Sequence, residues 1–176
     1  MNVLLVNATE LLREPGSRKH VEAAIPLADV DVAEARLTGD VVVDVTLEST
    51  LDDVEVAGTL TVDWTDTCRR CLRDVGGPLV IDVEERYAAE DPDAFPIDHG
   101  QIDLRPMVRE SVLLGVPDAP LCREDCPGLC PTCGADLTDD PDHEHDPARD
   151  ERWAVLDVLR QSGQDSLRQE PSDPVE

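Results

Sequence analysis

Four of the six cysteines lie in one short segment whose spacing suits a metal ion. Cys122, Cys126, Cys130 and Cys133 all fall between residues 122 and 133. The piece from Cys130 to Gly134 has the form of a zinc knuckle, in which a tight turn points two sulfur atoms inward. Zinc prefers four such ligands in a tetrahedron. We therefore predict a structural Zn²⁺ at these four cysteines; the alternative, inert reduced thiols on a loop, explains their density poorly.

A second cysteine pair, Cys68 and Cys71, lies upstream in the sequence CRRC. Three interpretations stay open. The pair could be a redox dithiol activated by the two arginines between them, it could complete a zinc ribbon with Cys130 and Cys133, or it could be a free structural pair. A redox pair is typical of a thioredoxin-like βαβ unit, whereas the surrounding pattern here predicts a β-hairpin.

Two histidines, His143 and His145, follow the cysteine segment in the sequence DHEHD. They could replace a cysteine as metal ligands. We expect instead that they are solvated loop residues among carboxylates.

The basic residues are scarce and unevenly placed. Lys and Arg number 15 against 40 Asp and Glu, which gives a formal net charge of −25. Two groups stand out: Arg13, Arg18 and Lys19, and Arg69, Arg70 and Arg73. If the two groups meet in space, they form one cationic patch that could contact an RNA backbone; otherwise they only balance nearby carboxylates.

The overall composition excludes several kinds of protein. A chain this acidic repels phosphate over most of its surface, which excludes non-specific nucleic-acid binding by overall charge. The four aromatic residues, Trp64, Tyr87, Phe95 and Trp153, are too few for base-stacking platforms. No signal peptide or membrane span is recognisable. We expect a cytoplasmic protein with reduced thiols and no membrane partner.

Period-two alternation of apolar and polar residues predicts three strands, at 41–51, 54–64 and 79–87. The first two strands are expected to form a hairpin, and the three together an antiparallel meander with one solvent-exposed face. A helix is expected from Asp103 to Leu114, with a buried stripe that includes Leu104, Met107, Val108, Ser111 and Val112.

The expected fold class is therefore α+β: an antiparallel sheet with a few short helices and a small zinc-stapled C-terminal segment. Residues 1–120 form the sheet and helix core. Residues 121–161 form the cysteine-rich segment, an acidic stretch and a short helix around Trp153, and residues 162–176 are a disordered tail. Residues 88–102 are expected to be a loop.

Motifs of common enzyme classes are missing from the sequence. It has no Gly-rich phosphate loop, no G-x-S-x-G and no H-E-x-x-H. We therefore predict no catalytic residues, no enzymatic activity and no small-molecule substrate.

Four pieces of the chain resemble the large ribosomal RNA subunit accumulation protein family, the YceD family, in its actinobacterial form. They are LLREPGSRKH at 11–20, CRRCL at 68–72, IDLRPMVRESVLLGVPDAPLC at 102–122 and CREDCPGLCPTCGADL at 122–137. The resemblance implies a role in large-subunit assembly or 23S rRNA accumulation, with large-subunit rRNA or its precursor as partner. Genes of this family often neighbour that of ribosomal protein L32, a second candidate partner.

The family also bears on the two cysteine groups. Some members lack the C-terminal cysteines and keep the upstream pair, which implies that the two groups need not share a metal and favours the local site. We thus expect a non-enzymatic assembly factor. The alternatives are an acidic chaperone for a basic ribosomal protein such as L32, and a thiol-redox enzyme that uses Cys68 and Cys71.

Overall fold

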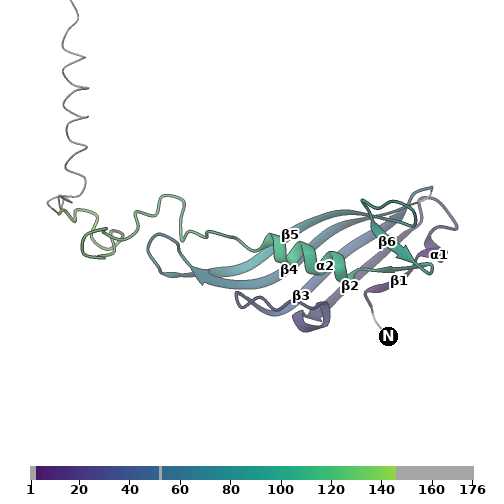
Figure 1. Ribbon diagram of the computed structural model, residues 1–176, viewed down its shortest axis with the longest axis horizontal. Coiled ribbons are helices and arrows are strands. Elements are labelled where there is room, and N and C mark those ends of the chain that lie inside the picture. The colour runs from purple at the N-terminus through teal and green to yellow at the C-terminus, as the bar shows by residue number, and fades with distance from the viewer. Residues whose placement is uncertain (1–2, 52, 146–176) are drawn as a thin grey trace, which may run out of the picture. The chain divides into compact units, whose positions relative to one another are not determined.

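The computed structural model describes residues 3–51 and 53–145 (Figure 1). Its elements in chain order are β1 (Leu5–Asn7), α1 (Ala8–Leu11), β2 (Arg18–Pro26), the 3₁₀ helix η1 (Leu27–Val30), β3 (Leu37–Ser49), β4 (Val54–Thr67), β5 (Asp74–Ala88), β6 (Phe95–Asp98), β7 (Gln101–Asp103) and α2 (Arg105–Gly115). The three predicted strands are confirmed as β3, β4 and β5, and the predicted helix is confirmed as α2.

Within the described residues, the strands form one seven-stranded sheet in the order β1-β7-β6-β5-β4-β3-β2. All neighbours are antiparallel except β5 and β6, which are parallel, so the sheet is mixed rather than purely antiparallel. The fold is α+β-like but mostly β, because the two α-helices within the described residues are short.

The alternation of residues along β3 and β4 sets the two faces of the sheet. Val43, Val45 and Leu47 of β3 are buried, and they are in register with Leu60, Gly58 and Val56 of β4. Residues of opposite parity face solvent. Because successive side chains of a strand point to opposite faces, this pairing collects the apolar residues on one side.

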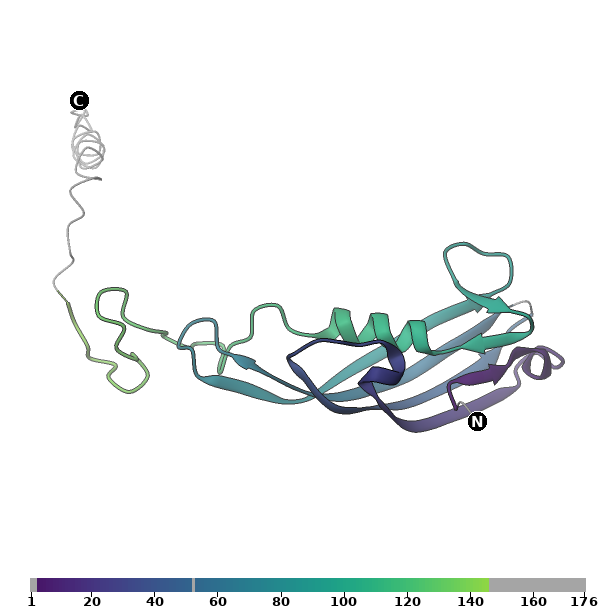
Figure 2. The ribbon, with the colours of Figure 1, turned by 60° about the horizontal axis from the view of Figure 1, so that its bottom comes forward.

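Helix α2 covers that apolar side of the sheet. Leu104 at its N-cap and Met107, Val108 and Val112 along it are fully buried in the core. Figure 2 shows α2 and the segment that contains η1 lying on the same face of the long strands. The predicted stripe of α2 is thus confirmed, except that Ser111 is only half-buried.

Two parts of the sheet were not expected from the sequence. Residues 88–102, predicted to be a loop, contain β6 and most of β7, which are four and three residues long. Strand β2 has only Val21, Ile25 and two alanines as apolar residues, so its alternation is weak. Strand β2 pairs along its whole length with the longer β3, and β6 and β7 pair with each other between β5 and β1. Both segments thus acquire strand structure from their neighbours in the sheet rather than through their own pattern.

The chain forms two compact units, which divide between Cys126 and Pro127. Cys122 and Cys126 therefore belong with the sheet, and residues 127–145 are the described part of the second unit. The expected helix around Trp153 and the expected tail at 162–176 lie outside the described residues. Within the described part of the chain, no helix combines the length and apolar character needed to cross a bilayer.

Candidate metal centres

The first cysteine pair lies at the tip of the β4–β5 hairpin. The last paired residues of the hairpin are Thr67 and Asp74. Beyond them the backbone N–H of Cys68 donates to the carbonyl of Arg73 at 2.7 Å, and that of Leu72 donates to the carbonyl of Cys68 at 2.9 Å. This tight turn, in which Leu72 has a positive φ of 61°, buries Cys68 and Cys71 while the residues between them are exposed.

The segment that follows α2 returns to this tip. The backbone N–H of Arg69 donates to the carbonyl of Pro120 at 3.0 Å. The guanidinium of Arg70 donates to the carbonyl of Cys126 at 2.9 Å and to that of Glu124 at 3.3 Å. These contacts hold Cys122 and Cys126 against the hairpin cysteines.

The four sulfur atoms of Cys68, Cys71, Cys122 and Cys126 all lie within 4.8 Å of one another. Two Sγ–Sγ distances are 3.8 Å, between Cys68 and Cys126, and 3.6 Å, between Cys71 and Cys122. A tetrahedron with Zn–S bonds of roughly 2.3 Å has edges of about 3.8 Å. The four sulfurs are therefore spaced as the ligands of one zinc ion would be, and we call this set the four-cysteine cluster.

The thiols of the four-cysteine cluster differ in pKa because their surroundings differ. A hydrogen bond from the backbone N–H of Cys71 is the main cause that lowers the pKa of Cys68 to about 6, against the opposing effect of burial. The neighbouring thiol of Cys126, followed by burial, raises the pKa of Cys122 to about 12. One thiolate thus forms readily, and a cation at the centre would displace the remaining protons.

A second cluster lies within the second unit. Cys130, Cys133, His143 and His145 each offer a ligand atom within 4.8 Å of the others. Its two cysteines come from the predicted knuckle and its two histidines from the DHEHD sequence. Backbone N–H groups of Cys133 and Thr132 lower the pKa of Cys130 to about 7. Either cluster could hold a metal ion.

The structure therefore groups the cysteines differently from the expected set. Cys122 and Cys126 lie with Cys68 and Cys71, whereas Cys130 and Cys133 lie with the two histidines. The ribbon of Cys68, Cys71, Cys130 and Cys133 is likewise not the observed grouping. The partners of the hairpin pair are 51 and 58 residues away along the chain, so local spacing carries no signal for them. For the second cluster the sequence does contain a signal, because two cysteines spaced Cys-x2-Cys are followed by two histidines spaced His-x-His.

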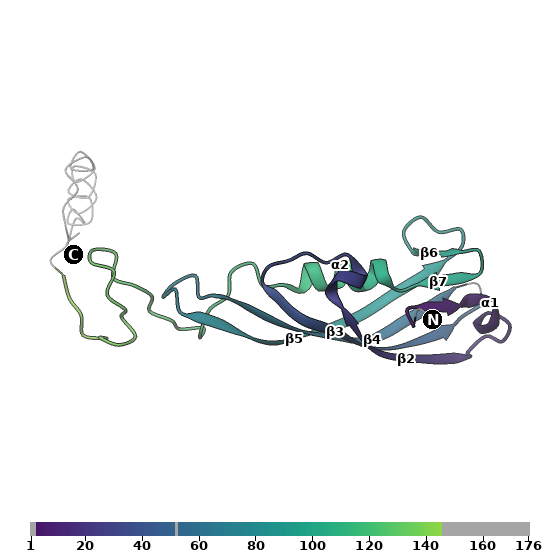
Figure 3. The ribbon, with the colours of Figure 1, turned by 90° about the horizontal axis from the view of Figure 1, so that it is seen from below.

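The two groups of basic residues lie at opposite ends of the sheet. Arg18 at the start of β2 is in register with Glu48, close to where β3 ends, and its guanidinium is 2.9 Å from the carboxylate of Glu48. Arg69 follows the far end of β4, a 14-residue strand that spans on the order of 45 Å. Figure 3 shows α1 and the β4–β5 turn at the two ends of the strands. Arg13, Arg18 and Lys19 therefore do not form one patch with Arg69, Arg70 and Arg73.

The solvent-facing side of β2–β5 is acidic. One row across the four strands is Glu22, Asp44, Thr59 and Asp82, all in register. Further exposed carboxylates lie along the same strands on either side of this row, at Asp40, Glu55, Asp63 and Glu84. We call this surface the acidic face.

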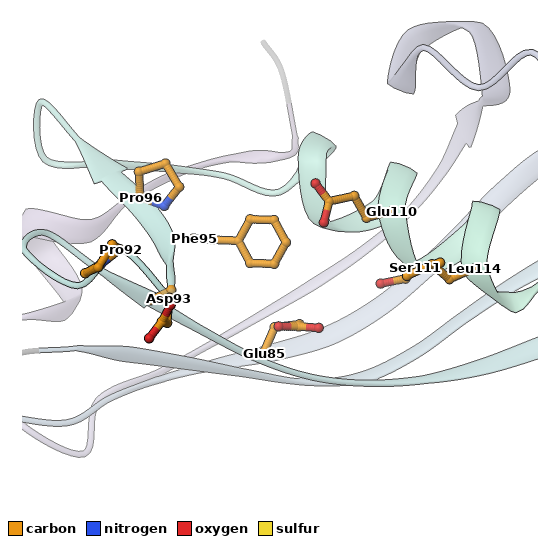
Figure 4. A pocket seen from close by; sticks show the side chains of 9 residues that line it. Glu85, Pro92, Asp93, Phe95, Pro96, Glu110, Ser111 and Leu114 are labelled. Atoms are coloured by element: carbon orange, nitrogen blue, oxygen red, sulfur yellow. The ribbon is translucent and has the colours of Figure 1, made fainter.

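A hollow of about 370 Å³ beside α2 is also acidic (Figure 4). Glu85, Asp93 and Glu110 contribute carboxylates to it, the ring of Phe95 lies among them, and none of its lining residues is basic. Burial, and then the charges of Asp103, Glu85 and Glu110, raise the pKa of the neighbouring Tyr87 phenol.

Comparison with known proteins places these features in a family. An uncharacterized protein of Mycobacterium leprae is 33% identical in an alignment 186 positions long, which covers 95% of this chain and 85% of that protein. Uncharacterized proteins of Mycobacterium bovis and Mycobacterium tuberculosis are each 31% identical over 95% of this chain and 86% of their own length. No solved structure matches the chain.

The family model described as large ribosomal RNA subunit accumulation protein YceD matches residues 56–160. The matched segment includes β4 from Val56 onward, the β4–β5 turn, α2 and both cysteine clusters. The match covers more than half of the chain, and the confirmed resemblance leads to one conclusion: this chain belongs to the YceD family of large ribosomal RNA subunit accumulation proteins.

Proposed function

We propose that the protein is a non-enzymatic factor that supports accumulation of large-subunit rRNA by contacting that rRNA or its precursor through the tip of the β4–β5 hairpin. The observation that carries this proposal is which arginines lie inside the segment that matches the family. The matched segment includes the exposed Arg69, Arg70 and Arg73, and it excludes Arg13, Arg18 and Lys19. Arginine is well suited to phosphate recognition.

Zinc at the four-cysteine cluster has a structural role in this proposal. A bound ion would join the hairpin to the segment 120–126 and fix the backbone that carries Arg69. Structural zinc sites contribute binding free energy on the order of 10 kcal/mol to folding, so a short hairpin turn becomes a rigid surface.

A thiol-redox role for Cys68 and Cys71 is a weaker explanation. Attack on a disulfide requires an accessible thiolate. The relative exposure of Cys68 is 0% and that of Cys71 is 4%. The sulfurs of Cys126 and Cys122 lie 3.8 Å and 3.6 Å from those of Cys68 and Cys71. This is the spacing of metal ligands, which supports a bound ion over a dithiol that cycles through a disulfide.

Arg69→Glu tests the proposed RNA contact. Residue 69 is exposed, and its contact with Pro120 uses the backbone N–H, which the substitution keeps. We expect weaker binding to large-subunit rRNA fragments and a salt slope smaller by roughly 0.9 on a duplex, and less on a single strand. Binding is measured by titration at several salt concentrations.

Arg18→Glu is the matched control for this experiment, because it makes the same charge change at the other end of the sheet. It should leave rRNA binding within about twofold. Wild-type affinity and an unchanged salt slope for Arg69→Glu would contradict an RNA contact at the tip.

A second candidate function is supported by the acidic face and the acidic hollow. Surfaces of this kind attract a cationic protein, and a basic ribosomal protein such as L32 is the candidate. If the acidic face binds such a protein, the double variant Asp44→Lys/Asp82→Lys should bind it more weakly. The affinity of the same variant for rRNA should rise or stay the same. Co-purification from cells, scored for rRNA precursor and for L32, distinguishes the two candidates.

A further inference from the structure

The second unit is built around a knuckle that already has the backbone geometry of a metal site. The N–H of Cys130 donates to the carbonyl of Ala135 at 2.8 Å, and the N–H of Gly134 donates to the carbonyl of Cys130 at 2.8 Å. Gly134 has a positive φ of 75°, a conformation that favours glycine. An isolated bridge between Leu129 and Asp136 closes the turn. The two sulfurs thus project from one rigid loop.

The loop that follows brings histidine nitrogens to these sulfurs. The Nε2 of His143 lies 3.2 Å from the Sγ of Cys133. The Nδ1 of the same ring lies 3.3 Å from a carboxylate oxygen of Asp140. A metal-ligating histidine commonly donates its other N–H to a carboxylate, which fixes the tautomer and the ring orientation. His145 lies against His143 with the ring centroids 4.7 Å apart and the rings edge-on.

The burial of His143 agrees with this role. Its side chain is only 20% exposed, although the acidic loop around it is largely exposed. A solvated loop histidine would be far more exposed, as His99 is at 94%. Two thiolates and two imidazoles are one of the common donor sets of structural zinc.

We propose that the chain binds two zinc ions, the second of them at Cys130, Cys133, His143 and His145, with Asp140 orienting His143. This site is separate from the four-cysteine cluster, and its existence does not depend on the proposed contact with rRNA. Its ligands all lie in the second unit, so it stabilises a local fold of residues 127–145 that has little apolar core of its own.

Elemental analysis of full-length protein purified without added metal gives the stoichiometry directly. We expect two zinc ions per wild-type chain. One zinc ion should remain in each of two double variants, Cys130→Ser/Cys133→Ser and Cys68→Ser/Cys71→Ser. A single site at Cys122, Cys126, Cys130 and Cys133 would instead give one zinc in the wild type and one in Cys68→Ser/Cys71→Ser. One equivalent or less in the wild type overturns the proposal.

Ligand identity is tested in the Cys68→Ser/Cys71→Ser background, where only the second site remains. Substitution with Co²⁺ should give a tetrahedral spectrum with about half the thiolate charge-transfer intensity of the four-cysteine cluster, since two of its four ligands are sulfur. His143→Ala should abolish this spectrum, and His143→Cys should restore it with higher charge-transfer intensity.

His99→Ala is the control, because it removes an exposed histidine outside both clusters. It should leave the cobalt spectrum and the zinc content unchanged. A full cobalt spectrum in His143→Ala would show that the histidine is no ligand and would overturn the proposed donor set.

Discussion

At the scale of single residues, the two arginines between Cys68 and Cys71 have different roles. The guanidinium of Arg70 donates to two carbonyls of the returning segment, whereas Arg69 uses its backbone for contact and leaves its side chain at the surface. In the sequence they are equivalent neighbours in one motif. Their difference arises because the segment 120–126 packs on one side of the turn, and no local pattern records that contact.

Arg70→Ala should weaken the four-cysteine cluster without altering its ligands. Two hydrogen bonds to backbone carbonyls are lost, which we expect to cost about 1 kcal/mol. Zinc should transfer faster to a competing chelator, as measured with a chromogenic indicator. Arg69→Ala, the neighbouring truncation, should leave the transfer rate near the wild-type value; equal rates in both variants would show that Arg70 does not hold the segment.

At the scale of elements, the long strands were predictable and the short ones were not. Strands β3 and β4 alternate between buried and outward-facing residues over most of their length, so their buried faces and their pairing could be predicted from the sequence. The close approach of the two strands at Gly58 could not be predicted in this way. Gly58 in β4 adopts a φ of 155°, and a Cβ there would lie 2.2 Å from the backbone carbonyl oxygen of Asp44. The two strands approach so closely that a side chain cannot fit between them.

Gly58→Ala should therefore destabilise the sheet. The contact is with backbone, which cannot move aside as a flexible side chain would, so we expect a loss of about 2 kcal/mol or more in the free energy of unfolding. Ala57→Val, an adjacent exposed position, adds more volume and should change stability by no more than about 0.5 kcal/mol. Denaturant unfolding measures both, and a loss at Gly58 no greater than that at Ala57 would contradict the close approach.

At the scale of the whole molecule, the sheet and the cysteine-rich unit depend on different sources of stability. The sheet buries a continuous apolar core that includes Val43, Leu60 and Met107. Among residues 127–145, the side chain of Cys130 is the only one that is buried. That a cysteine-rich segment follows the sheet can be read from the sequence, whereas the division of the cysteines between the two units depends on tertiary contacts.

Removal of zinc by a strong chelator should therefore affect the two units unequally. The β-sheet signal in circular dichroism and the main thermal transition should persist, because the apolar core does not depend on metal. Amide exchange should rise sharply across 127–145 and at the β4–β5 turn. Loss of the main transition on chelation would show that the sheet itself requires the metal.

The long separation between the two halves of the four-cysteine cluster has a consequence for synthesis of the chain. Cys71 and its neighbour Cys122 are 51 residues apart, so a nascent chain holds only half of this site until the segment after α2 has left the ribosome. Two thiols bind zinc far more weakly than four, and closing such a loop carries an entropic cost that grows with its length. The ligands at 130–145 become available almost together. With zinc bound at both clusters as proposed, metal capture at the hairpin would therefore be a late step on the growing chain, after the sheet and its helix are complete, whereas capture in the second unit would be a local event.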